Sequence, residues 1–333
     1  MTSGPILIVD DEPSNLAALR QVLGGLYRLA FVTCGSEVSV AVRKHSPALI
    51  LLDIQMPDMD GYTVCRALKA DPETQHIPVI FVTSLCEVGQ EMAGFDAGAV
   101  DYIVKPFSPP VVRARVGTHL SLVRAAILER SYQDAIYMLG EAGHYYDTDT
   151  GVHIWRMAAY ARALAEACGW DDERCQQLEL AAPMHDTGKV GIPDTILRKP
   201  GPLDAAEWQV MKTHATIGHH ILRRSDAPVF RMAADIALRH HERWDGSGYP
   251  DGLAGEDICE AARIVAVADV FDALSMRRPY KEPWPLEQVL AALREGVGKH
   301  FEPRLVEAFL DILPRVLNIQ ANWQREEDTR PAA

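Results

Sequence analysis

The first third of the chain alternates short apolar runs with amphipathic stretches. The apolar runs are residues 5–10, 48–52, 79–82 and 101–104. Between them, residues such as 15–23 and 63–69 repeat apolar side chains at helical spacing. Short runs that are apolar throughout are typical of strands buried on both faces of a parallel sheet. The alternation therefore predicts an open, doubly wound α/β sheet with helices on both faces.

From residue 145 onward the apolar positions follow helical spacing, and no strand-like alternation separates them. The predicted helices are residues 152–168, 174–184, 204–222, 231–241, 261–274 and 286–296. A series of helices without strands predicts an all-α bundle, in which side chains on facing helices can build a site in the interior.

A stretch with few helix breakers, residues 111–140, joins these two parts after Pro109 and Pro110. Its apolar residues recur every three or four positions with arginines between them, which predicts one long helix. Two arrangements of this helix stay open. It either packs on its own domains or pairs with a second copy of the chain in a parallel homodimer.

The length of 333 residues also favours two domains. We place a first domain at residues 1–122, a helical linker at 123–140, a second domain at 141–320 and a flexible polar tail at 321–333. The formal net charge of −13 argues against binding DNA, RNA or an anionic membrane surface. The sequence has no long apolar run for membrane insertion, and its six cysteines have no metal-binding or redox spacing, so we expect a cytoplasmic protein.

Polar side chains stand where the predicted strands end. They are Asp10, Asp11, Asp53, Thr83 and Lys105. The carboxyl ends of parallel strands meet at one edge of the sheet, where such folds place their active sites. Three carboxylates brought together there repel one another unless a cation lies among them, and oxygen ligands favour Mg²⁺. Lys105 and the Thr83 hydroxyl can contact a phosphoryl group at this edge.

These strand ends resemble the receiver domain of two-component response regulators, a flavodoxin-like fold, over residues 5 to about 120. The matching motifs are Val9-Asp10-Asp11-Glu12-Pro13, Asp53 with Met56-Pro57 and Asp60-Gly61, Thr83-Ser84, and Lys105-Pro106-Phe107.

The resemblance implies that Asp53 accepts a phosphoryl group from a cognate sensor histidine kinase. It implies Mg²⁺ binding by Asp10, Asp11, Asp53 and the backbone carbonyl of Gln55. The switch that reports phosphorylation would consist of Thr83, Tyr102 and Lys105.

A second set of polar side chains recurs along the predicted helices. Its members are His153, His185, Asp186, His214, His240, His241 and Asp269. Each histidine alone is more often a surface or core residue, but imidazoles and carboxylates on successive helices are the ligands that divalent transition metals prefer. The adjacent His185 and Asp186 can give two metals a shared carboxylate, and close metal pairs suit hydrolysis of phosphate esters. The pattern predicts a metal-dependent phosphohydrolase.

A glycine-rich loop, residues 243–252, follows His241 and carries Tyr249. Together with the histidines it resembles the HD-GYP family over residues 141 to about 315. The matching motifs are His185-Asp186-Thr187-Gly188-Lys189, residues 240–250, residues 269–274 and Arg278-Pro279-Tyr280-Lys281. The resemblance implies an HD-type helical bundle that hydrolyses cyclic di-GMP, a bacterial second messenger.

By this resemblance the seven imidazoles and carboxylates bind two divalent transition metals, of which Fe, Mn and Ni are the candidates, and Asp186 bridges them. The implied substrate contacts are Lys189, Tyr249, Arg278 and Lys281. Family members with a third metal carry Glu four residues before the first histidine. Here Asp149 stands at that position, four residues before His153, and its shorter side chain favours two metals while leaving a third open.

Together the two resemblances predict a response regulator in which phosphorylation controls hydrolysis of cyclic di-GMP to linear pGpG, with GMP after a second cut. The alternative is an effector or scaffold that binds cyclic di-GMP with low turnover and acts through protein partners.

Overall fold

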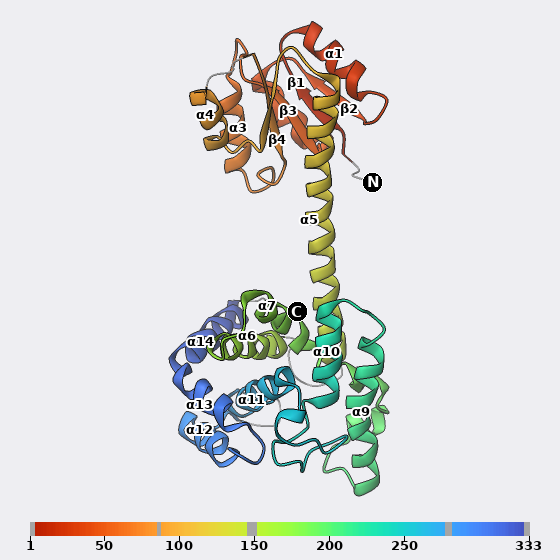
Figure 1. Cartoon of the computed structure of the whole chain (residues 1–333), viewed down its shortest axis with the longest axis vertical. Helices are drawn as coiled ribbons and strands as arrows, with labels where there is room; N and C mark the ends of the chain where they lie inside the picture. Colours follow the sequence, from red (N-terminus) through yellow and green to blue (C-terminus); the bar gives the residue numbers. More distant parts are fainter. Residues whose placement is uncertain (1–3, 85–87, 145–151, 277–281, 330–333) are drawn as a thin grey trace. The chain divides into compact units, whose positions relative to one another are not determined.

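The computed structural model describes residues 4–84, 88–144, 152–276 and 282–329 of the chain. It divides into two compact units, residues 1–131 and 132–333 (Figure 1). Each unit has a hydrophobic core of its own.

The first unit contains a parallel sheet with the strand order β2-β1-β3-β4-β5. Its strands are β1 (Ile6–Val9), β2 (Leu29–Val32), β3 (Leu49–Asp53), β4 (Val79–Thr83) and β5 (Asp101–Val104). This is the flavodoxin-like order, which confirms the predicted fold class. The apolar runs did not reveal β2, because this strand lies at the edge of the sheet and only Val32 of its four residues is buried.

Helices cover both faces of this sheet, as Figure 1 shows. They are α1 (Pro13–Leu23), α2 (Val38–His45), α3 (Gly61–Ala70), α4 (Val88–Asp96) and the start of α5 (Pro109–His144). Successive strand residues point to opposite faces. Ile6 and Ile8 therefore pack with residues of α1 and α5, whereas Leu7 and Val9 pack with residues of α2 and α3.

The predicted connecting helix is α5, and its two ends belong to different cores. Val112 and Val116 are buried in the core of the first unit. Ile136 is buried in the core of the second unit. In the middle of the helix, Ile127 and Leu128 are 58% and 69% exposed.

The second unit is built from helices, which confirms the predicted all-α class. They are α6 (Val152–Ala167), α7 (Asp172–Ala181), η2 (Ala182–Met184), η3 (Thr187–Gly191), α8 (Asp194–Leu197), α9 (Ala205–Leu222), α10 (Pro228–Arg239), η4 (Gly255–Asp257), α11 (Glu260–Ser275), α12 (Leu286–Glu295), α13 (Pro303–Asp311) and α14 (Leu313–Thr329). The helix predicted at 174–184 is divided between α7 and η2, since Pro183 cannot donate the hydrogen bond of a continuing α-helix.

Helices α6 and α11 pack against each other within the core of the second unit, where the ring of Tyr160 lies edge-on to Phe271. Helix α9 begins with a capping box, in which Asp204 and Glu207 satisfy the free amides of the first turn.

Helix α14 continues past residue 321, into the segment that the sequence predicts as a flexible tail. Its Trp323 is half-buried, and Gln320 donates to the Ser275 hydroxyl at 3.1 Å, so the helix is tied to α11.

Across the described ranges, no helix combines the length and the apolar character that crossing a membrane requires.

Candidate phosphoacceptor site and metal centre

The acids of the first unit meet at the carboxyl edge of the sheet, as the sequence predicts. Asp53 ends β3, and Asp10 and Asp11 follow β1, which is the neighbouring strand. One oxygen from each of the three carboxylates lies within 4.8 Å of the others. Asp10 and Asp53 are nearly fully buried, at 1% and 4% exposure. The donors are all oxygens, which suits Mg²⁺.

Lys105 lies between the two buried carboxylates. Its Nζ is 2.6 Å from Asp53 Oδ2 and 2.9 Å from Asp10 Oδ2. Burial raises the pKa of Asp53, the charge of Asp10 adds to this, and the hydrogen bond from Lys105 opposes it. The ammonium therefore compensates charge at the point where a phosphoryl group on Asp53 would add more.

The remaining predicted residues of this unit are Thr83, Gln55 and Tyr102. Thr83 ends β4 and is buried, and the backbone N–H of Gln55 donates to Asp53 Oδ1 at 3.3 Å. Tyr102 lies on β5, with the guanidinium of Arg115 5.1 Å from its ring centroid.

In the second unit, a tight cluster forms from four of the predicted ligands. One ligand atom from each lies within 4.8 Å of the others, and they are Asp186, His214, His240 and His241. Asp186 lies between η2 and η3, His214 is on α9, and the histidine pair follows α10. Asp186 Oδ1 is 3.3 Å from His214 Nε2 and 3.7 Å from His240 Nε2.

The hydrogen bonds of these imidazoles fix which nitrogen faces the cluster. The Nδ1 atoms of His185, His214 and His240 donate to backbone carbonyls three or four residues upstream, at 2.6–3.2 Å. A carbonyl can only accept, so each Nδ1 carries a proton, and in the neutral imidazole the opposite nitrogen, Nε2, then presents a lone pair. The Nε2 atoms of His214 and His240 are buried and make no hydrogen bond. Buried lone pairs around a carboxylate fit a divalent transition metal.

The electrostatics of His214 and His241 agree with neutral imidazoles, whereas the pKa of His185 is raised, because burial, which lowers it, is outweighed by Asp186 together with its other neighbours. Burial lowers the pKa of His214 to about 4. The charge of Asp186 opposes this shift, and the neighbouring His240 adds to it. Burial, with His240 again contributing, holds the pKa of His241 well below its usual value. Burial alone would raise the pKa of Asp186, but Lys189 and His185 hold it well below its usual range. Neutral imidazoles facing an ionised carboxylate are the protonation states that metal binding requires.

Close backbone packing brings these elements together. A Cβ added to Gly188 would lie 1.9 Å from the carbonyl oxygen of His214 and 2.5 Å from the amide of Gly218. Only glycine allows η3 and α9 to approach so closely. The contact places Lys189, which follows Gly188, with its Nζ 2.7 Å from Asp186 Oδ2.

His153 and Asp269 form the other side of the candidate site. His153 Nε2, on α6, lies 3.8 Å from Asp269 Oδ1, on α11. His185 Nε2 lies 3.4 Å from the second oxygen of Asp186, so Asp186 has imidazoles near both of its oxygens. Behind His153, its Nδ1 contacts the fully buried Asp272. Burial would raise the pKa of Asp272, but His153 and Arg156 beside it keep that pKa below its usual value.

The glycine-rich loop folds back onto the histidine pair. Its Tyr249 ring stacks on His241, with centroids 4.7 Å apart and planes at 26°. A Cβ on Gly248 would lie 2.4–2.6 Å from backbone atoms of residues 241–243, so this close approach requires glycine. The buried carboxylate of Glu242 accepts from the amides of Asp251 and Leu253 at 2.9 and 3.1 Å, which ties the loop to the end of α10.

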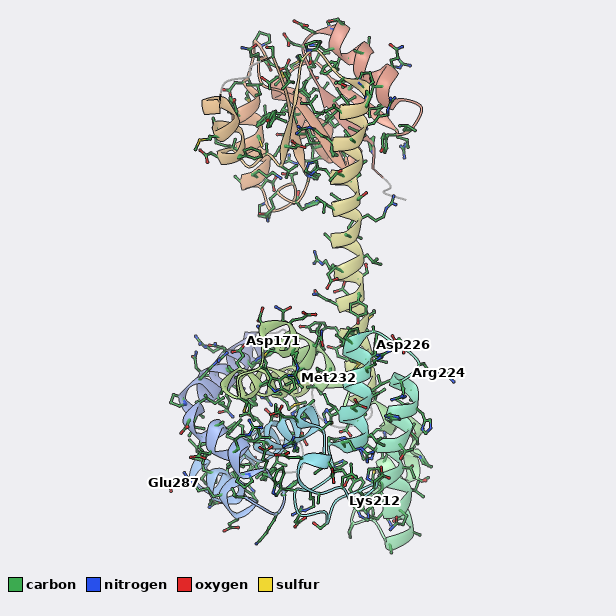
Figure 2. All side chains as sticks on the ribbon, viewed as in Figure 1. Asp171, Lys212, Arg224, Asp226, Met232 and Glu287 are labelled. Carbon is green, nitrogen blue, oxygen red and sulfur yellow. The ribbon has the colours of Figure 1, made fainter. Side chains whose placement is uncertain are left out.

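Three predicted site residues, Asp149, Arg278 and Lys281, lie outside the described residues. Conversely, the structure brings side chains to the site that the sequence reading gave no role. Lys212 of α9, labelled in Figure 2, lies with its Nζ 5.2 Å from the centroid of the Tyr249 ring. Asp272 was part of a matching motif, and its signal was a charged residue one turn after Asp269 in the largely apolar second half of α11.

Both units match known families. A model of the response regulator receiver domain matches residues 6–117, and a model of the HD domain matches residues 127–305. The HD match identifies the second unit as a member of a metal-binding hydrolase family, in keeping with its His/Asp cluster.

Three relatives are similar to this chain. A Vibrio cholerae protein named as a probable cyclic di-GMP phosphodiesterase is 39% identical over 97% of this chain and 80% of its own length. The cyclic di-GMP phosphodiesterase response regulator RpfG of Xanthomonas campestris is 40% identical over 92% of this chain and 86% of its own. A Vibrio cholerae 3'3'-cGAMP-specific phosphodiesterase is 44% identical over 59% of this chain and 37% of its own. The chain therefore belongs to the response regulators that join a receiver domain to an HD domain, the family that includes the cyclic di-GMP phosphodiesterases among these relatives.

Proposed function

We propose that this chain is a phosphorylation-regulated enzyme that hydrolyses cyclic di-GMP to linear pGpG. GMP would follow from a second cut. One observation carries the proposal: four ligand groups from three separate parts of the second unit meet within 4.8 Å, with buried imidazole lone pairs directed at a shared carboxylate. The full-length similarity to proteins named as cyclic di-GMP phosphodiesterases supports the choice of substrate.

In the receiver domain, Asp53 is the proposed phosphoacceptor. Its carboxylate, with those of Asp10 and Asp11, has the oxygen donors that Mg²⁺ prefers. Lys105 is already within 2.6 Å of Asp53, where it would pair with the phosphoryl oxygens. A sensor histidine kinase is the proposed phosphodonor, and Thr83 and Tyr102 would respond to the modification.

In the HD domain, the seven predicted ligands would hold two divalent metals, with Asp186 shared between them. When bound, the metals supply Lewis-acid activation of water and of the phosphodiester. The Nδ1 hydrogen bonds keep His185, His214 and His240 oriented, so these three imidazoles would need little reorganisation on metal binding. Lys189 places an ammonium beside Asp186, where it can neutralise a phosphate oxygen.

Tyr249 is the proposed contact to the nucleoside part of the substrate. Burial raises the pKa of its hydroxyl, and the charge of Asp186 acts in the same direction, so the phenol stays protonated and can donate a hydrogen bond. The local cations and metals let an anionic dinucleotide bind although the net charge of the chain is −13.

The test is product analysis by chromatography and mass spectrometry on the full chain loaded with Fe, Mn or Ni. Cyclic di-GMP and 3'3'-cGAMP are offered in parallel, with and without beryllofluoride as a phosphoryl mimic. We expect pGpG from cyclic di-GMP, at a rate that beryllofluoride changes in the parent but not in Asp53→Asn. An exposed acid of the same domain provides the matched control, Asp96→Asn.

Two outcomes would contradict parts of this proposal. Tight binding of cyclic di-GMP without any product would favour the effector or scaffold alternative. Faster cleavage of 3'3'-cGAMP than of cyclic di-GMP would assign the chain a different cyclic dinucleotide.

A further inference from the structure

A buried acid behind the metal centre has no part in the proposed function so far. Asp272 of α11 is fully buried and lies one helical turn after Asp269. It contacts His153 Nδ1, and it accepts two hydrogen bonds from Arg156, from Nε at 2.6 Å and from a terminal nitrogen at 2.8 Å. One carboxylate on α11 thus binds two side chains of α6.

This arrangement fixes the orientation of the His153 ring. His153 and Arg156 are three residues apart on α6, so they lie on the same face of the helix. The two-pronged bond from the planar guanidinium prevents the Asp272 carboxylate from rotating. With Nδ1 held by that carboxylate, the opposite nitrogen, Nε2, is directed toward Asp269 Oδ1 at 3.8 Å.

His153 differs in this respect from three other predicted metal ligands. His185, His214 and His240 donate to carbonyls within their own chain segment, three or four residues away. The Nδ1 partner of His153 is a carboxylate 119 residues later in the chain. A carboxylate is a stronger acceptor than a carbonyl and makes the opposite nitrogen a better metal ligand. The orientation of His153 therefore depends on the packing of α6 against α11.

We propose that Asp272, braced by Arg156, is a positioning residue for the metal held by His153 and Asp269. It sets the Nδ1–H tautomer of His153 and directs Nε2 toward the same cation as the Asp269 carboxylate. This inference rests on the proposed function in one respect, the assignment of His153 as a metal ligand.

The test measures metal binding without substrate. Metal-free full-length protein is titrated with Co²⁺, whose visible absorption reports its ligands, for the parent, Asp272→Asn, His153→Ala and the double variant. An asparagine at 272 can donate its amide N–H to Nδ1, which favours the wrong tautomer. We expect Asp272→Asn to weaken one Co²⁺ equivalent by about 10- to 100-fold. The double variant should bind Co²⁺ no more weakly than His153→Ala.

A matched control separates positioning from general destabilisation. Glu302 is another buried carboxylate that binds two arginines, Arg263 and Arg304. Among the described residues, neither of these hydrogen bonds reaches a predicted ligand. Glu302→Gln should lower thermal stability and leave Co²⁺ affinity unchanged. If circular dichroism shows that Asp272→Asn does not fold, Arg156→Lys replaces it, because lysine keeps the charge but loses the two-pronged bond. A several-fold weaker Co²⁺ equivalent is expected.

Suppose that His153→Ala binds Co²⁺ weakly. The inference would then be overturned if a folded Asp272→Asn, or Arg156→Lys in its place, binds Co²⁺ as the parent does. A double variant weaker than His153→Ala would also overturn it, since Asp272 would then act by another route. Parent-like binding by His153→Ala would instead remove His153 from the ligands, which is a failure of the proposed function.

Discussion

The two candidate cation sites of this chain use carboxylates in opposite ways. In the receiver domain three carboxylates gather, and a lysine ammonium lies within 3 Å of two of them. In the HD domain one carboxylate, Asp186, lies among the imidazoles of His185, His214, His240 and His241, with Lys189 at its edge, and a second, Asp269, lies beside His153. The first site offers only oxygen, whereas the second offers mostly nitrogen lone pairs.

Because of this difference, the two candidate sites of one chain would bind different metals. All-oxygen donors suit Mg²⁺, which keeps several of its waters, whereas imidazole donors select transition metals. The difference also extends to assembly. The receiver acids come from two adjacent strands, but the HD ligands come from several helices whose packing must be correct before the cluster exists.

Removal of the carboxylate of Asp186 should have the largest effect on the HD-domain site. Asp186→Ala takes away the group that both metals are proposed to use, so both should be weakened together. We expect hydrolysis to fall by more than about 10³-fold, since a single electrostatic stabiliser is worth about 10²–10³. Metal content by mass spectrometry should fall in parallel. The exposed Asp226, labelled in Figure 2, provides the control Asp226→Ala, which should retain metal and activity. Parent-like metal content in Asp186→Ala would refute the bridging role.

A change of cation should separate the two sites. With Mg²⁺ as the only divalent ion, phosphorylation of Asp53 by acetyl phosphate should proceed at the parent rate, while hydrolysis of cyclic di-GMP should be at least about 10²-fold slower than with Mn²⁺. Intact mass and product chromatography on the same sample measure both reactions. Equal hydrolysis with Mg²⁺ and Mn²⁺ would show that the imidazole cluster does not discriminate between them.

Loosening the glycine-rich loop should affect substrate binding while sparing the metals. Glu242→Gln places an amide group against the backbone N–H groups of Asp251 and Leu253, so at least one of these partly buried hydrogen bonds loses its acceptor. We expect thermal unfolding to report a loss of about 1–3 kcal/mol. KM should rise, because Tyr249 is carried by this loop. If Glu242→Gln has the KM of the parent but contains less metal, then Glu242 supports metal binding instead of substrate binding.

The smallest expected effect concerns metal number. Asp149 has one methylene fewer than the glutamate that HD-GYP family members with a third metal carry at this position. We therefore expect Asp149→Ala to keep two metals per chain and an activity within about twofold of the parent. A carboxylate ligand must lie about 2.0–2.2 Å from its metal, so lost reach empties a site. Asp149→Glu tests this directly, because a gained third metal would identify reach as the limit. Loss of a metal in Asp149→Ala would contradict the two-metal prediction.

Much of the fold could be predicted from the sequence, because burial leaves a periodic trace along the chain. Strands β1, β3, β4 and β5 and the helices that carry His153 and His214 all lie where the apolar pattern predicts them. Strand β2 could not be predicted, since an edge strand with one buried residue has no apolar run. The helix beyond residue 321 could not be predicted either, because its own composition is polar and the core contacts of α14 come from earlier residues such as Val316 and Leu317.

The chemical types of the candidate ligands can be predicted from residue order alone: acids at strand ends, imidazoles on helices, and a glycine-rich loop after a histidine pair. Residue type and local spacing are properties of the chain, so they can be read before it folds. Folding in three dimensions is needed to establish that Gly188 lets η3 approach His214 and that Asp272 binds His153. These contacts join residues up to 119 positions apart, and their geometry is set by helix packing, which no local pattern encodes.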